Sequence, residues 1–305
     1  MLPYAVVATQ RGRGMEYRDS ADISGAQVTR AGGGGGGGGR MAVGGIGGLI
    51  LLVLGLIFGF NPSSIMGADP GAAPQPQAGN PVTECTRGSD VAKNRDCRWQ
   101  AYMSSIGGYW SGALRDFRPA PLVIFSQQVS TGCGAASSEV GPFYCPADEK
   151  IYLDTEFTAQ LLRQLGARGG DAAEAYIIAH EYGHHIQNLT GTMAQVQAAG
   201  QQTGPSSPQV RLELQADCYA GVWFKHSTED PNGAIKAVSQ DDLNRIVDAA
   251  KAVGDDRIQQ SSSGRVSPES WTHGSAAQRK YWVAKGFNTG DPRQCDTFST
   301  NQLGA

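Results

Sequence analysis

The stretch that decides the fold is Ala179-His180-Glu181-Tyr182-Gly183-His184-His185, in a chain of 305 residues. Four residues along an α-helix turn through about 400°, so His180 and His184 lie on one face, one turn apart. Two imidazoles in this arrangement can hold one Zn²⁺, and Glu181 lies where a carboxylate can take a proton from a metal-bound water. His185 lies about 140° from His180 around the helix and is not expected to bind the same ion. Taken alone, these residues also fit a helix whose histidines bind nothing.

A catalytic zinc needs a third protein ligand and one position left open for water. The segment Arg211-Leu-Glu213-Leu-Gln-Ala-Asp217-Cys218 places two carboxylates four residues apart, on one face of a second predicted helix. Glu213 is the predicted third ligand, and Asp217 is the predicted acceptor for the free ring N–H of a ligand histidine. The alternative is a solvated acidic face. It fits poorly, because apolar residues surround the pair and buried carboxylates need a partner.

Periodicity and turn signals predict a mainly helical domain with a small sheet ahead of the active helix, and therefore an α+β fold class. An apolar, β-branched run at 121–125 indicates a strand, and the runs 143–145 and 150–154 flank a turn typical of a hairpin. Helix patterns cover six further segments, the last of which opens on a capping box at Ser275: 90–103, 155–165, 172–189, 208–225, 240–253 and 275–283.

Residues 41–60 form an apolar run of 20 residues without a charge. Twenty helical residues rise about 30 Å, which matches a bilayer core, so we expect one transmembrane helix here. A cleaved signal peptide is the alternative, but its apolar region is usually shorter. Five arginines precede the run and no lysine or arginine follows it before Arg87. The positive-inside rule then places the N-terminus in the cytoplasm and residues 61–305 outside.

Composition divides the rest of the chain. Residues 1–40 are polar and include a run of eight glycines, so we expect a disordered cytoplasmic tail. Residues 61–82 are rich in Pro, Ala and Gly, which is typical of an extended linker. Residues 83–297 are predicted to form a single domain outside the membrane, large enough to bury one core.

The six cysteines all follow the apolar run, and their even number favours disulfides in an oxidising compartment. Six cysteines allow 15 sets of pairs. We expect the two pairs that are close in sequence to form, which leaves the third pair by default: Cys85–Cys97, Cys133–Cys145 and Cys218–Cys295.

His-Glu-x-x-His followed by Glu-x-x-Ala-Asp on a second helix resembles the gluzincin metallopeptidases. Longer stretches are similar to the bacterial family called putative neutral zinc metallopeptidases, and the resemblance extends from the apolar run through nearly the whole predicted domain. The stretches that carry it are Phe143-Tyr-Cys-Pro146, Ile151-Tyr-Leu-Asp154, His180-Glu-Tyr-Gly-His-His-Ile-Gln187, Glu213-Leu-Gln-Ala-Asp217 and Trp271-Thr-His-Gly-Ser275.

The resemblance implies a zincin-like fold in which the strand at 151–154 is a sheet edge that receives an extended substrate. His273 and Arg279 resemble the His…Arg pair of membrane-linked gluzincins, which implies that His273 stabilises an oxyanion. The other roles that it implies are Glu181 as the general base, Asp217 as the support of a ligand histidine, and a zinc site made of His180, His184 and Glu213.

The expected function is that of a membrane-anchored zinc metallopeptidase, in which a zinc-activated water and the base Glu181 hydrolyse peptide bonds of envelope proteins. The expected partners are a protein or peptide substrate and the membrane. A net charge of −3 and a pI of about 6.0 give no reason to expect nucleic acid. The alternatives are hydrolysis of a non-peptide amide and a catalytically silent, zinc-stabilised scaffold module. Glu181 argues against the scaffold, because a structural zinc needs no general base.

Overall fold

The computed structural model describes residues 14–31 and 79–304. The predicted transmembrane helix at 41–60 and most of the predicted linker lie outside these ranges. Among the helices of the described ranges, none combines the length and the apolar character needed to cross a bilayer.

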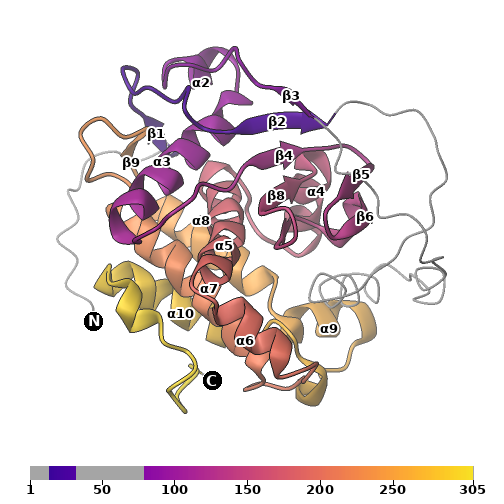
Figure 1. Cartoon of the computed structure of the whole chain (residues 1–305). Coiled ribbons are helices and arrows are strands. Elements are labelled where there is room, and N and C mark those ends of the chain that lie inside the picture. The colour runs from indigo at the N-terminus through magenta and orange to yellow at the C-terminus, as the bar shows by residue number, and fades with distance from the viewer. Residues whose placement is uncertain (1–13, 32–78, 305) are drawn as a thin grey trace.

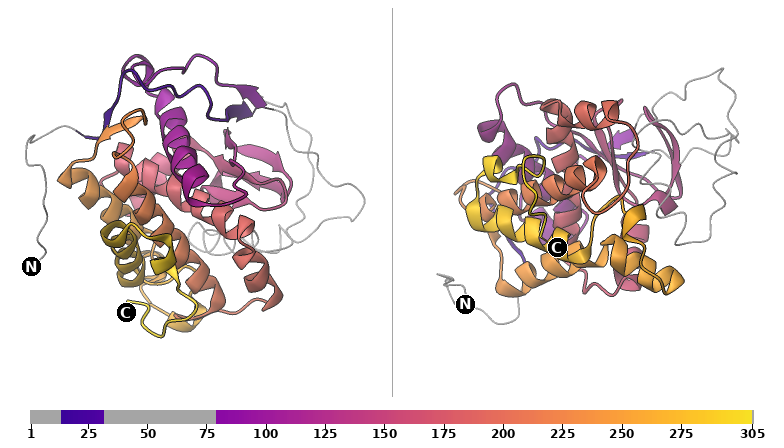
Figure 2. Two further views of the ribbon diagram at one scale, coloured as in Figure 1. Left: turned by 60° about the vertical axis from the view of Figure 1, so that its left-hand side comes forward. Right: turned by 90° about the horizontal axis from the view of Figure 1, so that it is seen from below.

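Helices cover more of the described chain than strands do (Figure 1). Their bounds are α2 (Asp90–Lys93), α3 (Cys97–Ala113), α4 (Thr155–Gln164), α5 (Asp171–Leu189), α6 (Thr192–Ala198), α7 (Pro208–His226), α8 (Gln240–Ala252), α9 (Asp255–Ser263) and α10 (Ala276–Thr289), with short 3₁₀ turns η2 (Ser138–Val140), η3 (Pro268–Ser270) and η4 (Pro292–Cys295). The helix α5 is central: it packs against α3, α7 and α8 and also against the sheet. Figure 2 shows the strands of residues 122–153 on one side of α5 and the C-terminal helices on the other.

The strands are β1 (Glu16–Tyr17), β2 (Val28–Ala31), β3 (Gly79–Pro81), β4 (Leu122–Ile124), β5 (Gln128–Thr131), β6 (Gly134–Ser137), β7 (Phe143–Cys145), β8 (Lys150–Leu153) and β9 (Ile235–Ala237). Five of them form one mixed sheet in the order β3-β2-β4-β8-β7. In this sheet β2, β4 and β8 run parallel, and β3 and β7 run antiparallel at the two edges. The prediction that 151–154 forms an edge was therefore wrong, since β8 lies between β4 and β7.

The predicted disorder of residues 1–40 was wrong for residues 14–31. Met15, Ile23 and Val28 are buried in the main core, β1 pairs with β9, and β2 pairs with β3 and β4. The reason is that these strands gain their partners from segments far along the chain. Few apolar residues and no local period mark them, so their order depends on contacts that composition does not report.

The pairing of β2 also constrains topology. Residues 28–30 face 122–124 across a parallel ladder, so both segments lie on the same side of any membrane. The expected arrangement, an N-terminus in the cytoplasm with residues 61–305 outside, involves a crossing at 41–60, which lies outside the described residues.

The mainly helical α+β class was confirmed, and most predicted elements occur within a few residues of their expected bounds. Local signals explain this. Ser207 caps α7 by accepting from the backbone N–H of Val210, and Ser275 and Gln278 form the expected capping box of α10. The predicted helix at 90–103 is instead two helices, and α10 continues six residues beyond its predicted end at Val283. The hairpin β5–β6 and the helices α6 and α9 were not predicted.

Close approach of helix backbones brings the site together. A Cβ at Gly183 of α5 would lie 2.9 Å from the Cα of Ala216 on α7, and a Cβ at Gly286 of α10 would lie 2.0 Å from the carbonyl oxygen of Cys218. Only glycine permits these contacts, so α5, α7 and α10 meet at distances that side chains would forbid. The three predicted disulfides are all present. The bond Cys218–Cys295 ties α7 to the turn that follows α10.

Candidate metal centre

Two helices supply a cluster of possible ligands. His180 and His184 project from α5 and Glu213 from α7, and one ligand atom from each lies within 4.8 Å of the others. The Nε2 of His180 is 3.2 Å from one carboxylate oxygen of Glu213, and the Nε2 of His184 is 3.4 Å from the other. All three side chains are buried. The helical spacing of four thus places the three predicted ligands around one point.

The opposite ring nitrogens are held by acceptors. His180 Nδ1–H donates to Asp217 at 2.9 Å, and His184 Nδ1–H donates to the side-chain oxygen of Gln187 at 2.8 Å. The amide of Gln187 is itself oriented, because its nitrogen donates to the carbonyl oxygen of Leu212 and to Gln215. Both Nε2 atoms therefore face the cluster, where each can bind a metal once it carries no proton, and two imidazoles with one carboxylate are a donor set that suits zinc.

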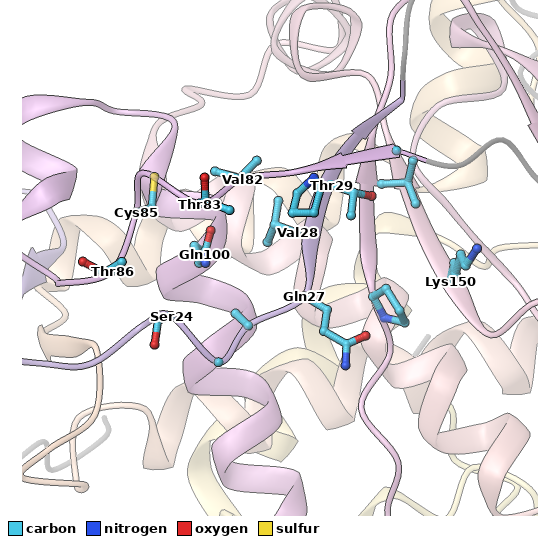
Figure 3. Close-up of a pocket in the computed structure, with 16 residues that line it drawn as sticks. Ser24, Gln27, Val28, Thr29, Val82, Thr83, Cys85, Thr86, Gln100 and Lys150 are labelled. Carbon is cyan, nitrogen blue, oxygen red and sulfur yellow. The ribbon is translucent and has the colours of Figure 1, made fainter.

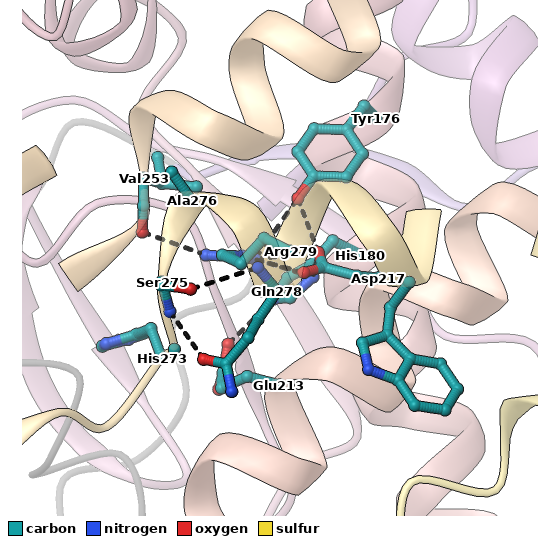
Figure 4. A network of polar contacts seen from close by, with 12 residues as sticks. Tyr176, His180, Glu213, Asp217, Val253, His273, Ser275, Ala276, Gln278 and Arg279 are labelled. Atoms are coloured by element: carbon teal, nitrogen blue, oxygen red, sulfur yellow. Dashed lines mark hydrogen bonds and ion pairs between the residues drawn. The ribbon is translucent and has the colours of Figure 1, made fainter. Parts of the chain in front are cut away.

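Asp217 lies at the centre of a buried polar network (Figure 4). Arg279 of α10 donates to both of its carboxylate oxygens, at 2.8 and 2.9 Å, and the hydroxyl of Tyr176 donates to it at 2.5 Å. A fully buried carboxylate needs such compensation. Arg279, which sequence similarity associates with His273, is thus the ionic partner of Asp217. A third nitrogen of its guanidinium donates to the carbonyl oxygen of Val253.

In the metal-free protein, burial and the charges of neighbouring side chains determine the pKa values of the three proposed ligands. Burial by itself would lower the pKa of His180, but hydrogen bonds to Asp217 and Glu213 and the charge of Asp217 raise it to about 9. Burial lowers the pKa of His184 to about 4, against the attraction of Glu213. Burial would raise the pKa of Glu213, yet the charges of His184 and His273 hold it well below its usual range. A zinc ion would therefore displace a proton from His180 when it binds.

Glu181 differs from every other carboxylate in the cluster. It is buried, and one of its carboxylate oxygens has no hydrogen-bond partner among the described residues. Burial raises the pKa of Glu181 to about 7, which the charge of His180 and the backbone N–H of Tyr144 only partly oppose. A carboxylate with a pKa near neutrality, next to the ligands, can accept and return a proton.

His273 lies on the loop before α10 and lines the same cavity as the three ligands. Asp255 fixes this loop, because one of its oxygens accepts from the backbone N–H groups of 272, 273 and 274 at 2.8, 2.7 and 3.0 Å. Burial would lower the pKa of His273, but the charges of Glu213 and Asp255 raise it. A raised pKa favours the protonated ring, and a protonated ring beside the ligands suits the stabilisation of negative charge.

The cavity in front of the cluster has a polar wall and an apolar wall. The polar wall consists of the ligands with Glu181, His273 and Arg279, and the cavity volume is about 100 Å³. This is roughly three times the volume that one water occupies in the liquid, so the space suits one side chain. The apolar wall is made of Pro142, Leu161, Leu162, Leu165, Ile177, Val253 and Ile258.

His185 lies on a different face of α5 and is not near the ligand atoms. Its Nε2–H donates to the carbonyl oxygen of Arg118 at 2.7 Å, and its Nδ1 accepts from the hydroxyl of Tyr144 at 3.0 Å. Burial lowers its pKa, which favours the neutral ring. Sequence reasoning did not find the roles of Gln187, Tyr176 and Tyr144. Gln187 and Tyr176 carried a local signal, because on the same helix they lie three residues after His184 and four residues before His180.

A second cavity of about 520 Å³ lies between residues 24–29 and 79–86 (Figure 3). Gln100 lines it, and its side-chain oxygen is buried without a partner among the described residues. None of the predicted site residues lines this cavity, so it is separate from the metal centre.

Comparison with known proteins agrees with this site. A family model described as "Putative neutral zinc metallopeptidase" matches residues 13–298. An uncharacterized protein of Mycobacterium tuberculosis, Rv2575, is 45% identical over 254 residues, which are 79% of this chain and 86% of that protein. The uncharacterized protein YpfJ of Escherichia coli is 39% identical over 266 residues, or 83% and 87% of the two chains. No solved structure matches the chain. The match over nearly the full length shows that this protein belongs to the putative neutral zinc metallopeptidase family.

Proposed function

We propose that this protein is a zinc-dependent peptidase whose general base is Glu181. The main support is the position of that carboxylate, which is buried beside His180 and His184 and has one oxygen without a hydrogen-bond partner in the described part of the chain. The two histidines and Glu213 would hold the zinc, which would act as a Lewis acid and lower the pKa of a water toward about 7. A peptide carbonyl placed in the cavity would face both these ligands and Glu181, because all of them line it.

The residues of the chain divide the remaining work. Glu181 accepts the proton that the attacking water loses and passes it to the leaving amine. His273, whose pKa is raised and which lines the cavity, donates to the oxygen on which negative charge develops. Asp217 holds His180 in the tautomer whose Nε2 is free, and Arg279 neutralises the charge of Asp217.

The apolar wall suggests which peptide bonds are cut. A side chain next to the scissile bond would enter the space among Leu161, Ile177 and Ile258. Its burial there favours an aliphatic or aromatic residue, at about 25 cal/mol for each Å² of apolar surface removed from water. The open edge nearest the cavity is β7, so an extended substrate would add to β7 rather than to β8.

A zinc-stabilised scaffold is the competing function. A structural zinc is usually closed by four protein ligands. The described residues bring three together, and Glu181 and the cavity take the remaining side.

The decisive variant is Glu181→Gln, which keeps the shape of the side chain and removes the base. Purified wild type should cleave fluorescently labelled casein in a chelator-sensitive reaction, and the variant should lose at least 10³-fold in kcat, the upper part of the range for general base catalysis. Zinc, measured by mass spectrometry, should stay near one per chain in both. Comparison of envelope proteomes from cells carrying each form would identify the natural substrate. Undiminished cleavage by Glu181→Gln would disprove the assignment of Glu181 as the general base.

We also propose that the domain works outside the cytoplasm. Its three disulfides support an oxidising compartment. The ladder between β2 and β4 supports the same side for residues 14–31, so a chain that enters the membrane within 41–60 returns to the side it left.

Labelling of introduced thiols tests this location. All six native cysteines are paired, so Ser20→Cys and Ser299→Cys, both at exposed positions, each provide one free thiol. We expect a membrane-impermeant maleimide to label both in intact spheroplasts. Labelling of position 299 alone would support a single membrane crossing between positions 20 and 299. Labelling of neither position would place the domain inside the cell.

A further inference from the structure

We propose that His185 and Tyr144 are positioning residues that fix the edge strand β7 against α5 and so set the place of Glu181 relative to a bound peptide. The inference rests on the proposed peptidase function. It concerns the face of α5 away from the proposed metal ligands. A chain of hydrogen bonds between that face and the edge of the sheet supports it.

The geometry determines the tautomer of His185. The side chain is fully buried, at 0% exposure, and its Nε2 lies 2.7 Å from the carbonyl oxygen of Arg118. A carbonyl can only accept, so Nε2 carries the proton. Asn188 donates to the hydroxyl of Tyr144, so this hydroxyl has its own proton to give, and it donates across 3.0 Å to Nδ1, which accepts.

The hydroxyl of Tyr144 is fixed from a second direction. The side-chain nitrogen of Asn188, one turn after His185 on α5, donates to it at 2.9 Å. The hydroxyl therefore donates once and accepts once, both times with α5. A buried network in which each group is satisfied has one preferred arrangement, and such networks rigidify the elements that they join.

The position of Tyr144 connects this network to the reaction. It is the middle residue of β7, whose outer side is the sheet edge, and Pro142, two residues earlier, lines the cavity of the metal centre. The backbone N–H of Tyr144 also faces the carboxylate of Glu181. A shift of β7 along α5 would therefore move a wall of the cavity and a donor to the base together.

The same face of α5 holds the segment that enters β4. Tyr182 accepts from the backbone N–H of Ala120 at 3.3 Å, and His185 holds the carbonyl of Arg118 two residues away. The strand β4 pairs with β8, and β8 pairs with β7. The same face of α5 therefore holds the segment before β4, inside the sheet, and also β7, at the sheet edge. Displacements of about 1 Å at a reacting group can cost a hundredfold in rate, so this fixation matters for catalysis.

The test compares two tyrosines on adjacent strands. Tyr144→Phe removes the hydroxyl that α5 holds. Tyr152→Phe, the matched control on β8, removes a hydroxyl that donates to Asp148 at 2.6 Å, on the opposite face of the sheet, where Tyr152 packs with a separate core. We expect Tyr144→Phe to lower kcat on labelled casein about tenfold to a hundredfold with zinc near one per chain, and Tyr152→Phe to stay within twofold of wild type.

Amide hydrogen exchange gives a second measurement that does not depend on activity. Exchange of the peptide that covers 141–146 should accelerate in Tyr144→Phe and stay close to wild type in Tyr152→Phe. Equal kcat in both variants, with equal shifts in Tm, would mean that the hydroxyl of Tyr144 only stabilises the fold and would overturn the proposal. Unchanged exchange at 141–146 in Tyr144→Phe would overturn it too. If wild type cleaves no casein, the peptidase assignment loses its support, and the exchange measurement still decides whether His185 and Tyr144 fix β7.

Discussion

The helix α5 presents buried histidines on two faces, and the faces differ in whether the rings keep a nitrogen available for a metal ion. On the metal face, His180 and His184 each use Nδ1 to donate to a fixed acceptor, while both Nε2 atoms point toward Glu213 and an adjoining cavity. On the sheet face, His185 uses both ring nitrogens on groups of the protein, the hydroxyl of Tyr144 and the carbonyl of Arg118.

This difference distinguishes a metal-binding histidine from a structural one, even where the two are adjacent in sequence. His184 and His185 are neighbours in sequence and both are buried, so residue type and burial do not distinguish them. The partners of the ring nitrogens do. A ring that keeps one lone pair free beside other ligand atoms can bind a metal, and a ring with both nitrogens engaged joins two parts of the fold.

The largest expected difference between the two faces appears when each ring is removed in turn. His184→Ala should lose the bound zinc and with it all measurable hydrolysis, because two protein ligands rarely hold a catalytic zinc. His185→Ala should keep zinc near one per chain and lose about 1–3 kcal/mol of unfolding free energy, since the hydroxyl of Tyr144 loses its acceptor and the carbonyl of Arg118 loses its donor. Zinc content by mass spectrometry and urea unfolding measure the two effects. Equal zinc loss in both variants would mean that the faces are not independent.

A second prediction uses the pH dependence of the metal-free protein. The pKa of Glu181 is raised from 4.5 to about 7, so between these values the folded state keeps a proton that the unfolded chain has lost. Stability from this group is full below pH 4.5 and is lost as pH rises through 7. At 1.36 kcal/mol for each pKa unit, the loss is on the order of 3 kcal/mol.

Urea unfolding of chelated wild type and Glu181→Gln at pH 5 and pH 8 isolates this effect. The variant cannot titrate at position 181, so it should gain stability relative to wild type on going to pH 8. The comparison removes the opposite contribution of His184, whose lowered pKa makes the fold less stable in acid. A wild type and a variant whose stabilities change in parallel would show that Glu181 titrates normally.

Helical periodicity explains why much of the metal face could be predicted. The spacings His180–His184 and Glu213–Asp217 each define one face of a helix, and the caps at Ser207 and Ser275 set where α7 and α10 begin. The close contacts at Gly183 and Gly286 then bring these helices together. Local sequence carries all of this information except the crossing of the helices.

The sheet face could not be predicted in the same way, because its partners are far apart in sequence. Tyr144 reaches His185 from 41 residues away, and β2 reaches β4 across more than ninety residues. A strand of three or four residues has no period long enough to indicate its neighbour. The edge strand was assigned to 151–154 from the family resemblance alone, and residues 14–31 were expected to be disordered because their strand partners lie far along the chain.

The smallest effect that would sharpen the comparison is expected for Asn188, the outermost member of the sheet-face network. Asn188→Ala removes one donor to the hydroxyl of Tyr144, which keeps its own bond to His185. Asn188 is only partly buried, so water can replace the lost donor, and the cost should be about 1 kcal/mol or less. Zinc content and kcat should stay within twofold of wild type. An effect on kcat as large as that of Tyr144→Phe would mean that Asn188, rather than His185, determines the position of β7, since Tyr144 would still hold its bond to the histidine.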